Sequence, residues 1–469
     1  MNFKKTVAIA AAVGALAAIS VPAMALENEF HGMYTFMGYQ TNFFDGTTYS
    51  VANAKAVLRP DAKGGWFAEQ RARVQYIAKA NDNLKLVTHF ELDSRFGGIA
   101  SGYKGTTGND SGNLDADMLT LETKSVYLDF NDPLTGANVK VGMQPWADSY
   151  QSLFLLADMT GVIATKKFGP ATASLGWFRF DDNTQAAAAS GPGKQTADLL
   201  VVEGKYAVNK DLTVGASYYN IQDDTVVVAA PATAVLFNTG VAAGVAVSAK
   251  ATAFELLHMV GVNADLNVGP ANIKPFAAFQ FGDKSATESL KGYLLGAVTK
   301  TQVGPGAVNF SAMYMSGDSN SATKGKAFAV VDRNTTYFNA ANMWLLVRNA
   351  GAVNSSTSVL GNDMTAGGRG LLGVFAGYEG TMGKVFYNAN VGYAQTAQAQ
   401  TATEKKALGT EINAQVGYKL YDNLSASAAV AYVKLGDALG SKTASDLIGS
   451  STADASNPYA INLRLAYTF

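Results

Sequence analysis

The chain has 469 residues, no cysteine and an almost balanced charge, with 36 lysines and arginines against 37 aspartates and glutamates. The lack of cysteine excludes disulfide bonds, a thiolate nucleophile, cysteine-ligated metals and covalently attached haem. The near-neutral charge excludes binding to nucleic acid through bulk electrostatics. After residue 25, the sequence has no unbroken run of the roughly 18 apolar residues that a membrane-spanning helix needs.

The first 25 residues have the pattern of a secretory signal peptide. Lys4 and Lys5 precede an apolar stretch over 7–21, and Ala23-Met24-Ala25 matches the small-x-small site of a signal peptidase. We therefore expect residues 1–25 to be cleaved and residues 26–469 to form one secreted domain. A retained anchor is the alternative, but the stretch is short and has the wrong flanks for a spanning helix.

Alternation of apolar and polar residues predicts about eighteen β-strands in the rest of the chain, with sixteen as the alternative count. In chain order, we expect them near residues 28–43, 66–79, 84–96, 118–130, 138–146, 161–168, 171–181, 196–208, 212–222, 251–266, 272–282, 288–301, 307–316, 368–382, 385–396, 406–420, 424–435 and 457–469. The alternation is clean in most of them and less clean over 171–181 and 251–266.

The connections between these strands alternate in length. Every second connection is a short turn, such as 81–83, 168–170, 268–270 and 382–384, and the others are mostly longer, up to the segment 317–367. Short turns at one end and long loops at the other are typical of outer-membrane barrels, and an even strand number returns both termini to the periplasm. We therefore predict an all-β fold: a transmembrane antiparallel up-and-down β-barrel with short periplasmic turns and long extracellular loops.

The hairpin over 66–96 has the clearest division between two faces. Its apolar face carries Trp66, Val74, Tyr76, Leu86, Phe90 and Leu92. Its polar face carries Glu69, Arg71, Arg73, Gln75, Lys85, His89, Glu91, Asp93 and Arg95. An arginine facing lipid near mid-bilayer would cost about 2–4 kcal/mol, and so many adjacent charges could not be desolvated cheaply in a packed core. The polar face is therefore predicted to line a wet interior.

The tight turn at 81–83 also predicts which charges are neighbours. Arg71 is expected beside Glu91 or Asp93, and Arg73 beside His89 or Glu91. Such inward charges could form a constriction field that orients permeating solutes. The alternative is that they only solvate the lumen wall.

The last predicted strand alternates up to the final residue, with Tyr459, Ile461, Leu463, Leu465, Tyr467 and Phe469 on its apolar face. This ending resembles the C-terminal strand of bacterial outer-membrane barrels, whose terminal Phe is read by the assembly machinery. The resemblance therefore implies that Tyr467 and Phe469 form a barrel-assembly signal.

In topology and ending, residues 26–469 resemble bacterial outer-membrane porins of the general-diffusion kind, and the segment 70–95 is similar to OmpJ-type porins of metal-respiring bacteria. The resemblance implies a homotrimer in the cell outer membrane, with a lipid bilayer around each barrel and small hydrophilic solutes passing through it. It also implies that the third external loop, about 147–160, folds into the lumen as a constriction loop. General-diffusion porins usually have sixteen strands, so eighteen is a departure that is more like the sugar-specific kind.

The loop over 147–160 supplies the remaining candidate pore residues. Asp148 and Asp158 are expected to provide an acidic side that faces the arginines of the hairpin. The apolar run from Leu153 to Leu156 could grip the inner wall, or could instead form a short external helix.

Metal sites have little support in the sequence, and we predict no metal or cofactor. Asp110, Asn113, Asp115 and Asp117 offer oxygen ligands for calcium, but their spacing fails the EF-hand pattern. The three histidines, His31, His89 and His258, are scattered along the chain.

Three classes of function remain open. The leading hypothesis is a water-filled channel for passive diffusion, because a barrel of 16–18 strands is wide enough for an aqueous passage. The second is a barrel sheath or scaffold around a periplasmic redox partner. The third is an outer-membrane enzyme, which is disfavoured because no G-x-S-x-G elbow or phosphate-binding loop occurs.

Overall fold

The computed structural model describes residues 26–43, 63–97, 121–182, 196–225, 255–285, 288–319, 325–332, 335–348, 358–360, 363–402, 404–440 and 455–469. Its strands are β1 (Glu27–Thr41), β2 (Gly65–Asn81), β3 (Leu84–Arg95), β4 (Glu122–Asn131), β5 (Asn138–Ala147), β6 (Leu156–Phe168), β7 (Ala171–Asp182), β8 (Thr196–Ala207), β9 (Leu212–Asp223), β10 (Leu256–Val268), β11 (Ala271–Ser285), β12 (Glu288–Leu290), β13 (Tyr293–Val303), β14 (Gly306–Met315), β15 (Leu371–Met382), β16 (Val385–Thr396), β17 (Ala407–Tyr421), β18 (Leu424–Leu435) and β19 (Tyr459–Thr468). Two short helical turns are η4 (Asn339–Ala341) and α3 (Asp437–Gly440). Among the described residues, no helix is long and apolar enough to cross a membrane.

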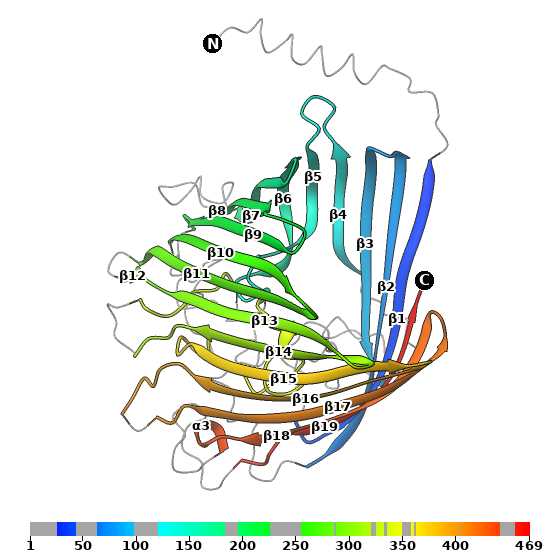
Figure 1. Ribbon diagram of the computed structural model, residues 1–469, viewed down its shortest axis with the longest axis vertical. Coiled ribbons are helices and arrows are strands. Elements are labelled where there is room, and N and C mark those ends of the chain that lie inside the picture. The colour runs from blue at the N-terminus through cyan, green and yellow to red at the C-terminus, as the bar shows by residue number, and fades with distance from the viewer. Residues whose placement is uncertain are drawn as a thin grey trace, which may run out of the picture.

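Eighteen of these strands form one closed antiparallel barrel (Figure 1). Each pairs with its neighbours in the ring, and the ring closes where β19 pairs with β1. The three-residue strand β12 lies outside the ring, because it pairs with the end of β11, which then pairs with β13. The predicted fold class and the predicted count of eighteen are therefore confirmed.

The strand positions agree with the sequence pattern except in four places. β4 begins at Glu122 and β10 at Leu256, whereas the sequence predicted starts near 118 and 251; residues 118–120 and 251–254 lie outside the described part of the chain. β6 begins at Leu156 instead of near 161, because residues 156–160 pair with β5. The loop expected over 147–160 is therefore only Asp148 to Leu155. The strand expected over 288–301 is divided into β12 and β13, because the N–H of Lys291 leaves the ladder and donates to the carbonyl of Gly325 at 2.8 Å.

Glycines define four of the short turns. Gly169, Gly269, Gly304 and Gly383 each follow a strand directly and have φ between 57° and 59°. That left-handed region is unfavourable for residues with a side chain, which explains why glycine recurs at the same point of each turn. These turns lie where the sequence predicts them, and together they fix the order of the barrel.

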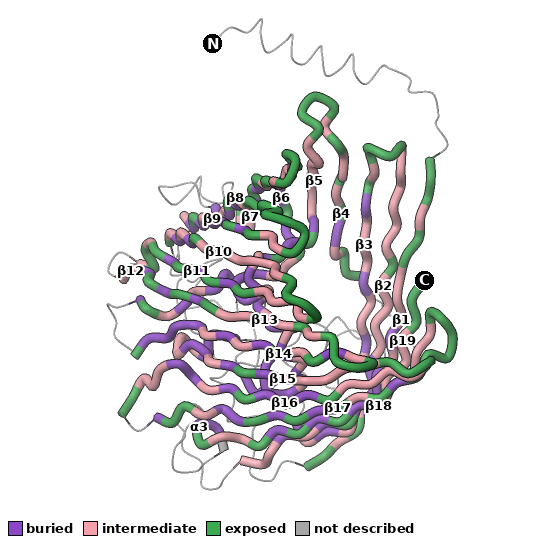
Figure 2. The backbone as a smooth tube through the Cα atoms, in the orientation of Figure 1, coloured by how far each residue is buried: buried purple, intermediate pink, exposed green. Residues whose placement is uncertain are grey.

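The outer face of the barrel is apolar and exposed. Figure 2 shows exposed residues alternating with buried ones along strands such as β16, β17 and β18. On β17, Ile412 and Val416 are 57% and 54% exposed, whereas Glu411, which points to the other face, is 0% exposed. A closed barrel has no free edge and satisfies its backbone hydrogen bonds internally, so such an apolar band is suited to lipid. The outer face is thus the surface that contacts a bilayer.

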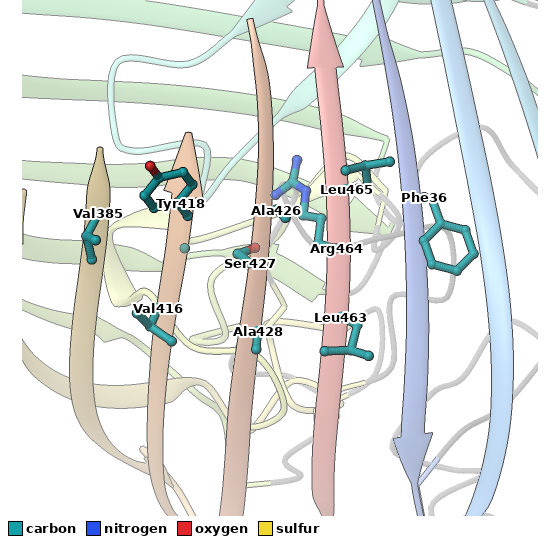
Figure 3. A pocket seen from close by; sticks show the side chains of 11 residues that line it. Phe36, Val385, Val416, Tyr418, Ala426, Ser427, Ala428, Leu463, Arg464 and Leu465 are labelled. Carbon is teal, nitrogen blue, oxygen red and sulfur yellow. The ribbon is translucent and has the colours of Figure 1, made fainter. Parts of the chain in front are cut away.

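The closing seam shows the same division at single-residue resolution. Phe36 and Leu465 are partners in register, and so are Met37 and Arg464. Figure 3 shows the outer side of this seam, an apolar groove with Val416 and Tyr418 on one flank, Leu463, Leu465 and Phe36 on the other, and Ala426 and Ala428 between them. Alternation places Leu465 on the lipid side and Arg464 on the lumen side.

Cysteine labelling tests this orientation. In the folded barrel, Arg464→Cys and Arg73→Cys are expected to react with a charged, membrane-impermeant thiol reagent, because both face the lumen. Leu465→Cys is expected to stay unlabelled, because a charged reagent does not enter the apolar band. The chain has no native cysteine to interfere. Fast labelling at position 465 with none at 464 and 73 would mean that the register is inverted.

Candidate functional site

A compensated cluster of charges covers the inner face of β2 and β3. Arg71 makes two hydrogen bonds to Asp93, from Nε to Oδ1 at 2.7 Å and from Nη2 to Oδ2 at 2.6 Å. Arg73 pairs with Glu91, and Arg95 Nη2 lies 3.4 Å from Glu69 Oε1. The neighbours of Arg71 and Arg73 are those that the turn predicted. Three arginines thus face three acids, and the cluster carries almost no net charge.

The other predicted wall residues of the hairpin share this face: His89 borders the cluster, and Lys85 lies further toward the turn. Lys85, close to the turn, pairs with Asp129 on β4 at 3.4 Å. His89 lies in register with Gln75 and Ser125 on its two neighbouring strands. The polar face of the hairpin therefore extends along the whole strand length, with its strongest charges in the half remote from the turn. That this face forms a constriction stays a prediction.

Asp148, the first of the two predicted loop acids, holds its own loop together. Its carboxylate accepts backbone N–H groups from Tyr150 at 2.5 Å, Ser152 at 3.2 Å, Phe154 at 2.8 Å and Leu155 at 2.7 Å. Burial raises the pKa of Asp148 to about 6, against the opposing effect of the four N–H donors. The carboxylate is directed at backbone, and not at the arginines as we expected.

Asp158, the second acid, belongs to β6 and not to the loop. It ion-pairs with Lys124 of β4, with Nζ 2.9 Å from Oδ2. Its side chain alternates with that of Met159, which is buried on the inner face. Both acids are therefore engaged by partners other than Arg71 and Arg73.

The short loop from Asp148 to Leu155 packs against the inner wall. Tyr150, Leu153, Phe154 and Leu155 are all buried. Phe154 stacks on Tyr219 of β9 with ring centroids 5.9 Å apart, and the Tyr150 hydroxyl bonds to Ser217 of the same strand. Of the two arrangements that the sequence allowed, the apolar run therefore lies on the wall and is not an external helix. Whether the loop narrows the pore stays a prediction.

A second segment also packs inside the barrel, and the sequence analysis missed it. We call residues 325–348, in their described parts 325–332 and 335–348, the partition. Its buried apolar side chains are those of Phe328, Val330, Val331, Phe338, Ala341, Met343, Leu345, Leu346 and Val347. These residues belong to one cluster with inner-face residues such as Leu199, Met259, Met313 and Phe375. A signal for it was present: five consecutive apolar residues over 343–347 are unusual in an exposed loop.

The partition and the short loop touch each other. The N–H of Tyr337 donates to the carbonyl of Ser152 at 2.9 Å. The rings of Phe328 and Phe154 meet edge to face with centroids 6.3 Å apart. Two segments that are distant in the sequence therefore form one packed body inside the barrel.

The interior is consequently only partly wet, which corrects the expectation drawn from the hairpin 66–96. In the described part of the chain, no residue of β1 to β4 belongs to the apolar cluster, whereas every strand from β5 to β19 contributes at least one residue to it. Leu257 and Met259, for example, are 0% exposed on the inner face of β10. Burying each large apolar side chain contributes about 1.5–3 kcal/mol. The partition is therefore a firmly packed part of the fold.

The proposed calcium ligands Asp110, Asn113, Asp115 and Asp117 lie outside the described residues. Within the residues that are described, no group of three or more His, Asp or Glu side chains has the arrangement of a metal site.

Comparison with known proteins gives a structural likeness only. No protein-family model matches the sequence, and no curated protein matches it significantly. The fold is similar to OpdQ of Pseudomonas aeruginosa, with a TM-score of 0.53 at 10% identity over 94% of this chain and 99% of that one. OccAB4 of Acinetobacter baumannii gives 0.53 at 12% identity, over 96% and 99%. A BenF-like porin from Pseudomonas fluorescens gives 0.50 at 11% identity, over 94% and 98%. The chain thus shares the fold of these three proteins, and in this chain that fold is a closed antiparallel barrel of eighteen strands.

Proposed function

We propose that the protein is a porin of the cell outer membrane, which lets ions and small hydrophilic solutes diffuse passively through a water-filled channel. The observation that carries this proposal is the charged inner face of β2 and β3, which needs water beside it and lies outside the apolar cluster. A barrel of eighteen strands is wide enough to hold such a passage beside a packed partition. The passage then runs between this charged wall and the partition. One of the solved structures of the same fold is a BenF-like porin by name, which agrees with the proposal.

Neither alternative function has comparable support. A sheath for a redox partner needs space for that partner, but the partition fills part of the lumen. Haem absorbance that co-purifies with the barrel would favour this alternative. An enzyme needs a nucleophile or base directed at a cleft, whereas the charged inner wall consists of arginine and carboxylate pairs. Lipid or peptide hydrolysis by the purified barrel would favour an enzyme.

Planar-bilayer recording tests the channel directly. The purified barrel is expected to give discrete conductance steps whose size falls as the ions of the salt become larger. The steps should persist without any added substrate or energy source, because diffusion is passive. Folded barrel that inserts into the bilayer without producing steps would contradict the proposal.

The proposal includes a homotrimer, as implied by the resemblance to porins, and a cleaved signal peptide over residues 1–25, as predicted from the sequence. The likeness to OmpJ-type porins is likewise a prediction.

Two measurements test the trimer and the signal peptide. Chemical cross-linking in native membranes is expected to give a ladder that ends at three subunits. N-terminal sequencing of the membrane form is expected to start at Leu26.

A further inference from the structure

A buried carboxylate on the barrel wall binds the backbone of the partition. Glu411 points inward from β17 and is 0% exposed. Its Oε1 accepts the N–H of Trp344 at 2.7 Å, and its Oε2 accepts the N–H groups of Leu345 at 2.9 Å and Leu346 at 2.6 Å. Three consecutive backbone donors therefore surround one carboxylate. Bonds to an ionised acceptor are roughly twice as strong as bonds between neutral groups.

Amide side chains on the wall support this contact. Asn413, two residues further along β17, donates from Nδ2 to Glu411 Oε1 at 2.8 Å and to the carbonyl of Asn342 at 2.9 Å. Asn390 of β16 donates in turn to Asn413 Oδ1 at 2.8 Å. We call Glu411, Asn413 and Asn390 the anchor. It is built from two adjacent strands and holds the partition at residues 342 and 344–346.

The wall is also shaped to receive the partition at this height. Gly392 of β16 is the register partner of Glu411. A Cβ atom at Gly392 would lie 2.6 Å from the sulfur of Met343, which is far below a normal contact. The missing side chain lets Met343 lie directly on the strand, beside the residues that Glu411 binds.

We propose that Glu411 is the positioning residue of the partition: its carboxylate, seated in the N–H groups of residues 344–346, fixes the partition against β16 and β17 and so sets the open cross-section of the channel. The inference rests on the proposed channel function. A glutamine at this position has one acceptor oxygen, and its NH₂ group would face a backbone donor. Loss of the charge should therefore release this part of the partition from the wall.

Conductance of Glu411→Gln tests the proposal. We expect a larger unitary conductance than in the wild type, and entry of larger sugars in liposome-swelling assays. The matched control is Glu404→Gln, which also removes a buried carboxylate. Glu404 binds Arg369 and the N–H of Gln400, and not the partition. The conductance of Glu404→Gln is expected to match that of the wild type. Heat-modifiable migration on gels shows that each barrel is folded.

A second variant and a cross-link keep the test decisive. Asn413→Ala removes three hydrogen bonds, those that Asn413 donates to Glu411 and Asn342 and the one that it accepts from Asn390. It buries no new polar group and keeps the Glu411 carboxylate, so it should also raise the conductance, but less. Ser311 on the wall donates to the carbonyl of Ala340 in the partition at 2.8 Å. In the Glu411→Gln variant, cysteines at 311 and 340 joined by a short bifunctional thiol reagent should lower the conductance again to the wild-type value.

The outcomes separate this inference from the proposed function. If the wild type forms no channels, the proposed function fails. If the wild type conducts and both folded anchor variants conduct like it, the positioning role of Glu411 is wrong. The same holds if Glu404→Gln raises the conductance as much as Glu411→Gln does, because the effect would then come from any lost buried carboxylate. Should Glu411→Gln not fold, Asn413→Ala decides alone.

Discussion

Replacing Arg71 and Arg73 together by alanine is expected to shift the reversal potential in a salt gradient strongly toward cations. In the wild type, the two guanidinium groups neutralise Asp93 and Glu91 across the hairpin. Their removal leaves two carboxylates on a half-buried wall, where a narrow, low-dielectric passage screens charge less than bulk water does. The change in local net charge is therefore from about zero to about −2.

Salt dependence and a neutral pair give the controls for this prediction. The shift should shrink as the salt concentration rises, since the screening length falls to about 3 Å at 1 M. Arg71→Gln combined with Asp93→Asn removes both members of one ion pair and leaves the local net charge unchanged, so its reversal potential should stay close to that of the wild type. If the double alanine variant folds and its reversal potential at low salt does not move, these residues are ordinary wall and the permeating ions pass elsewhere.

Much of the barrel could be predicted because its strands obey a strict two-residue period. Lipid on one side and water on the other divide the side chains of β2 and β3 completely, and the tight turn between them fixes their register. The observed pairs Arg71 with Asp93 and Arg73 with Glu91 follow from that turn. Local sequence contains this information, so it can be read without knowing the rest of the fold.

The contents of the lumen could not be predicted in the same way. Whether a long loop folds inward depends on contacts between residues far apart in sequence, such as Glu411 with Trp344. The unclear alternation over 171–181 and 251–266 was a sign that loops fold into the lumen beside these strands. Phe178, Leu257 and Met259 are apolar on the inner face because they pack against the inward segments and not against water. An apolar residue on the lumen side of a strand therefore marks where a loop is docked.

Asp148 shows why a residue type does not define a role. A loop aspartate near a charged wall suggested a group that faces the pore. Its carboxylate instead accepts four backbone N–H groups of the loop that follows it. Small polar side chains often bond to nearby backbone in this way, and only the conformation of the loop decides between the two roles.

Deleting Phe469 is expected to lower the yield of barrel in the outer membrane and to leave unfolded precursor in the periplasm. The residue forms the last backbone rung of the seam, since its N–H donates to the carbonyl of Gly32 at 3.0 Å and its carbonyl accepts the N–H of Gly32 at 2.9 Å. Its ring covers Gly32 closely: a Cβ atom on that glycine would lie 2.5 Å from the ring. Tyr467 stacks on the same ring with centroids 5.7 Å apart.

Two substitutions separate the contacts at the seam from the proposed role of Tyr467 and Phe469 as an assembly signal. Phe469→Ala keeps the backbone rung and loses the ring, so the seam should still close but unfold at a lower temperature. Thr468→Ala, one residue away, is the control and should assemble like the wild type.

If the ring acts only within the folded seam, Phe469→Ala reaches the membrane at normal yield and is merely less stable. If the ring is instead read during insertion, the yield of Phe469→Ala falls as far as that of the deletion variant. The Phe469→Ala molecules that do insert then keep most of their stability. Normal yield of the deletion itself, at native expression, would rule out both roles, because a barrel that closes and inserts without Phe469 depends on it for neither.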